Sequence, residues 1–93
     1  MIHARKDYNR IQDPENKIPK DEPVFLLRGQ DELAPELLLR WAANLRLKDG
    51  NPHMAEMVEE HAQKMLKWQK NNKITLPDLD LLDDANYIHQ GSI

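Results

Sequence analysis

Apolar residues in the middle of the chain recur at the intervals of an α-helix. They fall three or four positions apart between residues 31 and 48, at Leu33, Leu37, Leu38, Trp41, Ala42 and Leu45. Asp31 suits the N-cap of such a helix, and Pro35 is tolerated because an N–H in the first turn has no helical partner. Gly50 supplies a stop. The pattern therefore predicts a first helix from about Asp31 to Lys48.

A second helix is predicted directly after this stop. Asn51 followed by Pro52 is a strong start signal, with asparagine at the N-cap and proline at the first helical position. The helix continues to about Lys70, and its apolar stripe consists of Met54, Met57, Val58, His61, Ala62, Met65 and Trp68. The connection between the two helices is short, so we expect them to pack as an antiparallel αα-hairpin.

The flanking segments do not follow a helical period. Residues 23–28 form the main strand candidate, a short apolar run between Pro23 and Gly29, and its predicted partner is residues 73–76 or a second subunit. Residues 1–20 are polar, with five basic and three acidic side chains, and residues 77–93 carry four aspartates and no lysine or arginine. The sequence thus predicts a mainly α fold: an antiparallel αα-hairpin with one short β-strand over residues 21–76, an extended basic N-terminal arm and an extended acidic C-terminal tail.

Composition limits the classes of protein that fit this pattern. The chain has 93 residues, no cysteine and a formal net charge of −3. One small domain without disulfides has a marginal core, so we expect a homo-oligomer. The acidic balance argues against general nucleic-acid binding. No apolar run reaches the ~20 residues of a membrane span, and the first residues lack the apolar core of a signal peptide, so we expect a cytoplasmic protein without membrane contact.

The junction Arg28-Gly29-Gln30-Asp31 is the first candidate binding site. An arginine ends an apolar run, a glycine turns the chain and a helix begins. Helix N-termini present free N–H groups that attract anions, and Arg28 could add a bidentate contact to phosphate. The alternative is that Arg28 pairs with Asp31 or Glu32 and only orients the turn.

The basic arm is the second candidate. Three cationic side chains, Arg5, Lys6 and Arg10, surround Tyr8. Such a group could hold phosphates while the tyrosine ring stacks on a base. The alternative is a solvated arm in which Tyr8 fixes the segment to the core. The sequence leaves both interpretations open.

Metal binding, cofactors and catalysis have little support. His61 lies among methionines at helical spacing, which is typical of a core stripe, and no histidine set has the spacing of metal ligands. The chain has no cysteine, and its one serine, Ser92, is next to the C-terminus. We therefore expect neither a metal, nor a cofactor, nor an enzyme.

The apolar arc of the first helix is wider than one partner helix needs, because Leu39 and Leu47 extend it. This arc and the acidic, leucine-bearing tail are typical of a surface that binds another protein. The alternative is that the tail covers the arc within one subunit.

The run DEPVFLLRGQD over residues 21–31 is distinctive, and Leu33-Ala34-Pro35, Arg40-Trp41-Ala42 and Gly50-Asn51-Pro52 follow it. These segments resemble a family of short proteins from bacteriophage and prophage genomes, over roughly residues 5–78. Small non-catalytic phage proteins of this size include oligomeric sponges that capture cyclic oligonucleotide or ADP-ribose-type immune signals. By this analogy we expect an anti-defence protein that binds such a nucleotide through Arg28, Gln30, Asp31, Tyr8, Arg5, Lys6 and Arg10.

Overall fold

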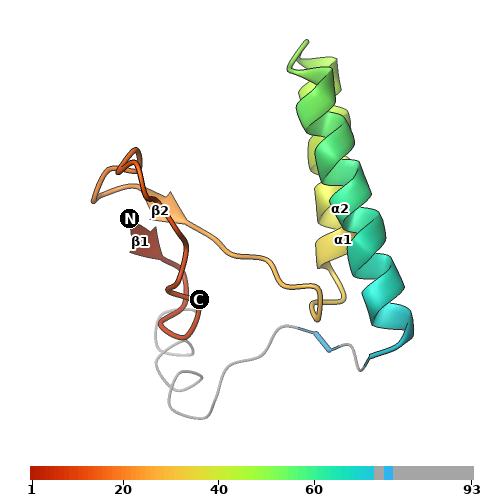
Figure 1. The fold of residues 1–93 in the computed structure, drawn as a ribbon, viewed down its shortest axis with the longest axis horizontal. Helices are drawn as coiled ribbons and strands as arrows, with labels where there is room; N and C mark the ends of the chain where they lie inside the picture. The colour runs from red at the N-terminus through yellow and green to blue at the C-terminus, as the bar shows by residue number, and fades with distance from the viewer. Residues whose placement is uncertain (73–74, 77–93) are drawn as a thin grey trace, which may run out of the picture.

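The computed structural model describes residues 1–72 and 75–76 of the chain. Its elements follow the order β1 (Ile2–His3), β2 (Pro23–Val24), α1 (Ala34–Leu47) and α2 (Pro52–Lys70). Figure 1 shows α1 and α2 side by side and antiparallel, which confirms the predicted hairpin in a mainly helical fold. The predicted acidic tail, residues 77–93, lies outside the described residues.

The two helices begin with different caps. The side chain of Asn51 accepts hydrogen bonds from the N–H groups of His53 and Met54 at 2.9 and 3.3 Å, so the predicted start of α2 is correct. The predicted start of α1 at Asp31 is three residues too early. The Asp31 carboxylate accepts from the N–H of Leu33 at 2.8 Å within a turn, and helical geometry begins only at Ala34.

The connection between the helices reverses the chain through Asp49 and Gly50. Asp49 has the left-handed backbone conformation, with φ of 54°. Gly50 donates its N–H to the Leu45 carbonyl at 2.8 Å. A Cβ at position 50 would lie 2.9 Å from that same carbonyl oxygen, so glycine is required by close approach rather than by its φ angle. The predicted stop is correct in position.

Small side chains form the contact between α1 and α2. Ala34, Ala42, Ala55 and Ala62 are completely buried, and Met65 is buried beside them. Alanine at these positions lets the two backbones approach closely. The ion pair of Arg46 on α1 with Glu59 on α2 joins the helices near their connected ends, with Nη2 donating to Oε1 at 2.8 Å. The hairpin is therefore held by close backbone packing and one charged contact.

Residues 1–24 form a small lobe that stands apart from the hairpin, to which residues 25–31 connect it (Figure 1). Within the lobe, β1 and β2 pair in parallel, with Ile2 opposite Pro23 and His3 opposite Val24. The N-terminal ammonium donates to the Pro19 carbonyl at 2.7 Å. The predicted strand over residues 23–28 is thus reduced to two residues, and its partner is the start of the chain rather than residues 73–76.

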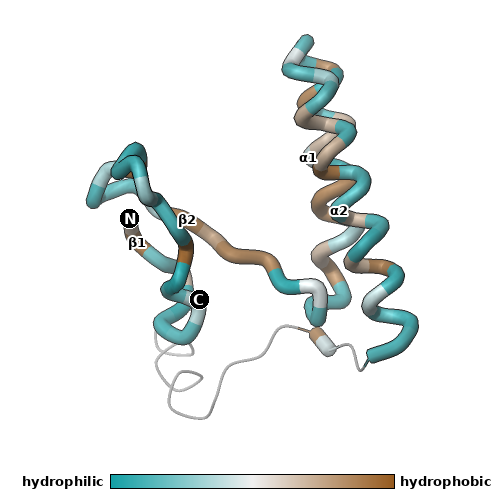
Figure 2. The backbone as a smooth tube through the Cα atoms, in the orientation of Figure 1, coloured by the Kyte–Doolittle hydropathy of each residue, from teal (hydrophilic) through white to brown (hydrophobic). Residues whose placement is uncertain are grey.

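Many large apolar side chains remain exposed. None of the described large side chains is fully buried, and the exposed ones are Ile2, Phe25, Leu33, Leu37, Trp41, Leu47, Met54, Met57, Leu66, Trp68 and Leu76. Figure 2 shows the apolar connection leaving β2 and apolar positions along both helices. Neither helix combines the length and hydropathy needed to cross a bilayer, within the described part of the chain.

Candidate functional site

The turn between the connection and α1 is fixed on both sides. The Gln69 side chain, near the end of α2, donates from Nε2 to the carbonyl oxygens of Gly29 and Asp31 at 2.9 and 3.0 Å. On the other side, Thr75 donates its N–H to the Gln30 carbonyl at 3.1 Å and accepts from the N–H of Glu32 at 3.0 Å. These bonds hold the backbone that carries the first candidate site against α2.

The N–H groups around the start of α1 already have acceptors. Leu33 donates to the Asp31 carboxylate at 2.8 Å, and Ala34 donates to the Asp31 carbonyl at 3.1 Å. Pro35 has no N–H to offer. The N–H groups of Leu33 and Ala34 are therefore not free for an anion, and Asp31 accepts both bonds from the turn that precedes α1.

Arg28 and Tyr8 bring the two predicted candidate segments together. Arg28 donates from Nη1 to the phenolic oxygen of Tyr8 at 2.9 Å, and its guanidinium carbon lies 5.5 Å from the ring centroid. The guanidinium of Arg5 lies 4.2 Å from the same centroid. We call Arg5, Tyr8 and Arg28 the arginine–tyrosine cluster. It links the lobe to the connection, so Tyr8 also fixes the arm.

The two arginines of this cluster differ in their electrostatic partners. Arg5 forms a two-pronged contact with Asp7, with Nε to Oδ1 at 2.9 Å and Nη2 to Oδ2 at 2.6 Å. This hydrogen bond holds the pKa of the Asp7 carboxyl below its usual value, and the charge of Arg28 adds a small effect in the same direction. Arg28 makes no ion pair with any described residue, so its predicted pairing with Asp31 or Glu32 is not formed. Its charge remains available to a ligand.

The remaining predicted site residues are placed differently. Lys6 and Arg10 are exposed on the lobe, and no contact joins either of them to the arginine–tyrosine cluster among the described residues. Gln30 is half-buried and lines a hollow beside Arg28. The structure therefore brings together Arg5, Tyr8 and Arg28, and sets Gln30 next to them.

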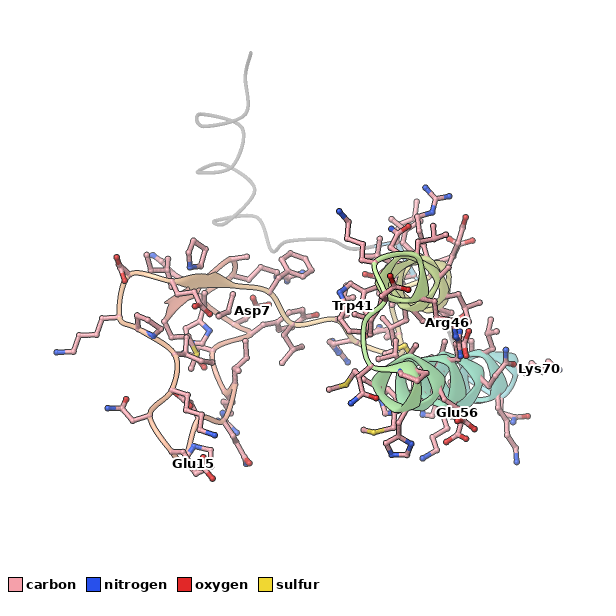
Figure 3. The ribbon with its side chains drawn as sticks, turned by 90° about the horizontal axis from the view of Figure 1, so that it is seen from above. Asp7, Glu15, Trp41, Arg46, Glu56 and Lys70 are labelled. Atoms are coloured by element: carbon pink, nitrogen blue, oxygen red, sulfur yellow. The ribbon has the colours of Figure 1, made fainter. Side chains whose placement is uncertain are left out.

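A hollow of about 330 Å³ lies between the connection and the C-terminal half of α2. Its lining residues are Leu27, Arg28, Gly29, Gln30, His61, Lys64, Met65 and Trp68. The sequence pattern predicts a core stripe that includes His61, Met65 and Trp68 of this set, and it gives Lys64 no role in a site. Their spacing at positions 61, 64, 65 and 68 places them on one helix face, which is the signal that a shared site leaves. Figure 3 shows the lobe, with Asp7 and Glu15, and the hairpin, with Arg46 and Lys70, from above.

The described residues contain no cluster of three or more histidine, cysteine, aspartate or glutamate side chains arranged to hold a metal ion. The side chains of the site instead offer guanidinium, ammonium, phenol and indole groups. These groups donate hydrogen bonds to anions and stack on planar rings. Comparison with protein-family models, curated proteins and solved structures gave no match to this chain.

Proposed function

We propose that this protein binds and sequesters a nucleotide-type signal, a cyclic oligonucleotide or an ADP-ribose derivative, without cleaving it. The observation that carries the proposal is the contact between Arg28 and Tyr8, at 2.9 Å. It sets a guanidinium without a carboxylate partner among the described residues beside an aromatic ring. A guanidinium fits two phosphate oxygens at once, and an aromatic ring provides a stacking surface for a base.

The chemistry of these groups favours binding over turnover. A guanidinium stays protonated at every physiological pH, so Arg28 can neutralise a phosphate but cannot act as a general base there. The Arg5 guanidinium adds positive charge beside the ring, although Asp7 offsets part of it. Tight binding of an intact signal would lower its free concentration in a cell. In keeping with the resemblance to phage proteins, we place this activity in the host cytoplasm, where it would counter a nucleotide-dependent defence.

We also propose that the functional form is a homo-oligomer. Leu33, directly before α1, and Leu37 and Trp41 on α1 recur every four residues, and each is about half exposed in the isolated chain. Burial of an apolar side chain of this size stabilises an assembly by about 1.5–3 kcal/mol when it is complete. The buried hairpin contact consists mostly of alanines, so this stripe provides the large apolar contacts that the single chain leaves unused.

An exposed apolar side chain of α1 outside this stripe supports a second candidate function, which is docking of a host or phage protein. Leu47 is 81% exposed at the end of α1, beyond the reach of the hairpin contact. Exposed large apolar side chains on one helix are typical of helix-binding surfaces. A host-lysate capture with wild-type protein, compared with Leu47→Glu, tests docking without changing Leu33, Leu37 or Trp41. Loss of one defined captured protein in the variant would favour docking.

Thermal unfolding with a ligand panel tests the nucleotide proposal. The panel contains cyclic di-AMP, cyclic tri-AMP and cyclic ADP-ribose. A ligand at a concentration of 100 Kd stabilises the folded state by about 2.7 kcal/mol, which shifts the Tm of a domain this small by roughly 10 °C or more. We expect at least one ligand to produce such a shift, and Arg28→Ala to abolish it.

Arg40→Ala is the matched control for that experiment. Arg40 lies on α1 and pairs only weakly with Glu36, at 3.6 Å, away from the arginine–tyrosine cluster. This variant removes an exposed guanidinium without touching the site, so its ligand-induced shift should equal that of the wild type. If no panel member raises the Tm of the wild-type protein, the proposed function is wrong for these signals.

A further inference from the structure

The hollow beside Arg28 has a rigid, partly apolar wall. Met65 forms a buried part of its lining, and Trp68 lies one helical turn further along α2 with 45% of its side chain exposed. The backbone of Gly29 lies against both, because a Cβ built there would be 3.8 Å from Met65 and 4.0 Å from Trp68. Gln69 fixes this backbone through its two hydrogen bonds. The indole is therefore held in a defined place and is still open to a ligand.

Positive charge gathers at the same hollow in a chain whose net charge is −3. Arg28 comes from the connection and Lys64 from α2, and none of the described lining residues is acidic. No described carboxylate makes an ion pair with Lys64, although Glu60 lies four residues before it on α2. Two cations without an ion pair to a described carboxylate line the same hollow, which favours an anionic ligand.

The size of the hollow is also suitable for a small ligand. Ligand pockets in proteins commonly measure about 300–1,000 Å³ and combine apolar walls with a few placed polar groups. At about 330 Å³, this hollow lies at the small end of that range. An aromatic base with its phosphate is a ligand unit of this kind.

We propose that this hollow binds one nucleoside-phosphate unit, with the phosphate between Arg28 and Lys64 and the base against Trp68. This inference rests on the proposed function, because Arg28 belongs both to the arginine–tyrosine cluster and to the hollow. It adds Lys64 and Trp68 as ligand-binding residues and limits the ligand class. Phosphate alone would contact only Arg28 and Lys64, and an uncharged nucleoside would contact only Trp68.

Tryptophan fluorescence provides a direct test, because the chain has only two tryptophans. Trp41 lies on α1 and does not line the hollow. In a Trp41→Phe background, the emission of Trp68 reports on the hollow alone. We expect AMP to produce a saturable change in this emission. Adenosine and inorganic phosphate should each bind at least tenfold more weakly than AMP, because each lacks one of the two contacts.

Charge variants in the same background test the role of Lys64. Lys64→Gln should weaken AMP binding about tenfold, since a hydrogen bond to a charged group is lost. Lys67→Gln removes an equal charge from an exposed position of α2 outside the hollow, and it should leave AMP binding unchanged. Equal AMP affinity in the two variants would overturn the assignment of Lys64. A Trp68→Phe protein that keeps Trp41 should show no emission change.

The outcomes separate this inference from the proposed function. Suppose that cyclic di-AMP stabilises the protein through Arg28, while Trp68 emission does not change and Lys64→Gln binds as well as wild type. The assignment of the hollow as the binding site is then wrong, and the proposed function stands. If AMP binds the hollow as described but no cyclic oligonucleotide or ADP-ribose derivative stabilises the protein, the proposed function is wrong. The assignment of the hollow as a nucleoside-phosphate site then stands. If AMP leaves Trp68 emission unchanged at every concentration, the hollow is not a nucleoside-phosphate site.

Discussion

Arg28 donates a hydrogen bond to the phenolic oxygen of Tyr8 at 2.9 Å, across a separation of 20 residues in the sequence. This contact ties the N-terminal lobe to the connection that leads into the hairpin. It also combines a cation and an aromatic ring that the sequence presents as parts of two separate candidate sites. Two substitutions at Tyr8 separate the contribution of its hydrogen bond from the contribution of its aromatic ring.

Tyr8→Phe keeps the ring and removes the acceptor for Arg28. We expect it to lower the free energy of unfolding by about 0.5–1.5 kcal/mol and to change nucleotide affinity little. Tyr8→Ala also removes the stacking surface, which is worth about 1–3 kcal/mol per base, so affinity should fall roughly 5- to 150-fold. Urea unfolding and titration calorimetry measure the two quantities. Wild-type affinity in Tyr8→Ala would show that the ring does not contact the ligand.

Gln69 is predicted to support the site without being a ligand contact. Its side chain donates to the Gly29 and Asp31 carbonyls, so Gln69→Ala leaves both without that donor. We expect a loss of about 1–3 kcal/mol in the free energy of unfolding, together with weaker AMP binding. Gln63→Ala, at an exposed position of α2, is the control and should be nearly neutral in urea unfolding. Equal stability of the two variants would show that the hydrogen bonds of Gln69 to Gly29 and Asp31 do not stabilise the fold.

Close packing of alanines predicts an asymmetric response to larger side chains. Ala42 is completely buried between α1 and α2, whereas the next residue, Ala43, is exposed. Ala42→Leu should force the helices apart and lower the free energy of unfolding by about 1–3 kcal/mol. Ala43→Leu should have little effect, since it adds a good helix former at the surface. Denaturant unfolding of both proteins compares them directly.

The hairpin could be predicted from the sequence because its signals are local. Periodic apolar residues and the Asn51-Pro52 start are read within a few turns of chain, and both correspond to the observed helices. The partner of β2 could not be predicted, because parallel pairing with Ile2–His3 depends on how residues 4–22 bring the chain back beside its start. In strands of two residues, the pattern of apolar and polar positions is too short to indicate which residues pair.

The candidate site was predictable only in part. Arg28 and Tyr8 stand out because of their residue types, but their contact depends on the path of the whole arm. The sequence pattern puts Trp68 in a core stripe and gives Lys64 no site role, since nothing local shows that the connection lies against that face of α2. The N–H groups of Glu32, Leu33 and Ala34 already have acceptors in Thr75 and Asp31, a set of contacts that the sequence does not show.

The ion pair between α1 and α2 predicts a dependence of stability on pH. The hydrogen bond from Arg46 lowers the pKa of the Glu59 carboxyl in the folded protein. A carboxyl whose pKa is lowered by folding stabilises the folded state at pH values above its ordinary pKa, about 4.3 for glutamate. This contribution is lost as the pH falls through the pKa of the folded state. Glu59→Gln should therefore have a lower Tm than wild type at pH 7, and this difference should disappear in acid.

Glu60→Gln is the control for that pH series. Glu60 is exposed on the same helix, next to Glu59, and no ion pair joins it to another described residue. Its Tm should follow that of the wild type from neutral pH into acid, apart from a small constant offset. A Glu59→Gln deficit that persists unchanged in acid would mean that packing, not charge, accounts for the effect of this residue.

The exposed stripe of α1 predicts self-association. Leu37→Glu places a charge among Leu33 and Trp41, so it should dissociate the oligomer. Ala43→Glu adds the same charge at an exposed position on another face of α1 and should keep the assembly. Sedimentation equilibrium gives both masses. A monomeric wild-type protein at micromolar concentration would contradict the proposed assembly.

Native mass spectrometry of the intact protein with cyclic di-AMP tests the central claim most directly, because it reports subunit number and bound ligand together. We expect an oligomer whose mass increases by whole numbers of ligand molecules, with Arg28→Ala keeping the oligomer and losing the added mass. Arg40→Ala should retain both. The same spectra are recorded with cyclic tri-AMP and cyclic ADP-ribose. An unliganded wild-type spectrum with all three ligands, or an equal added mass in Arg28→Ala, would contradict nucleotide capture through Arg28.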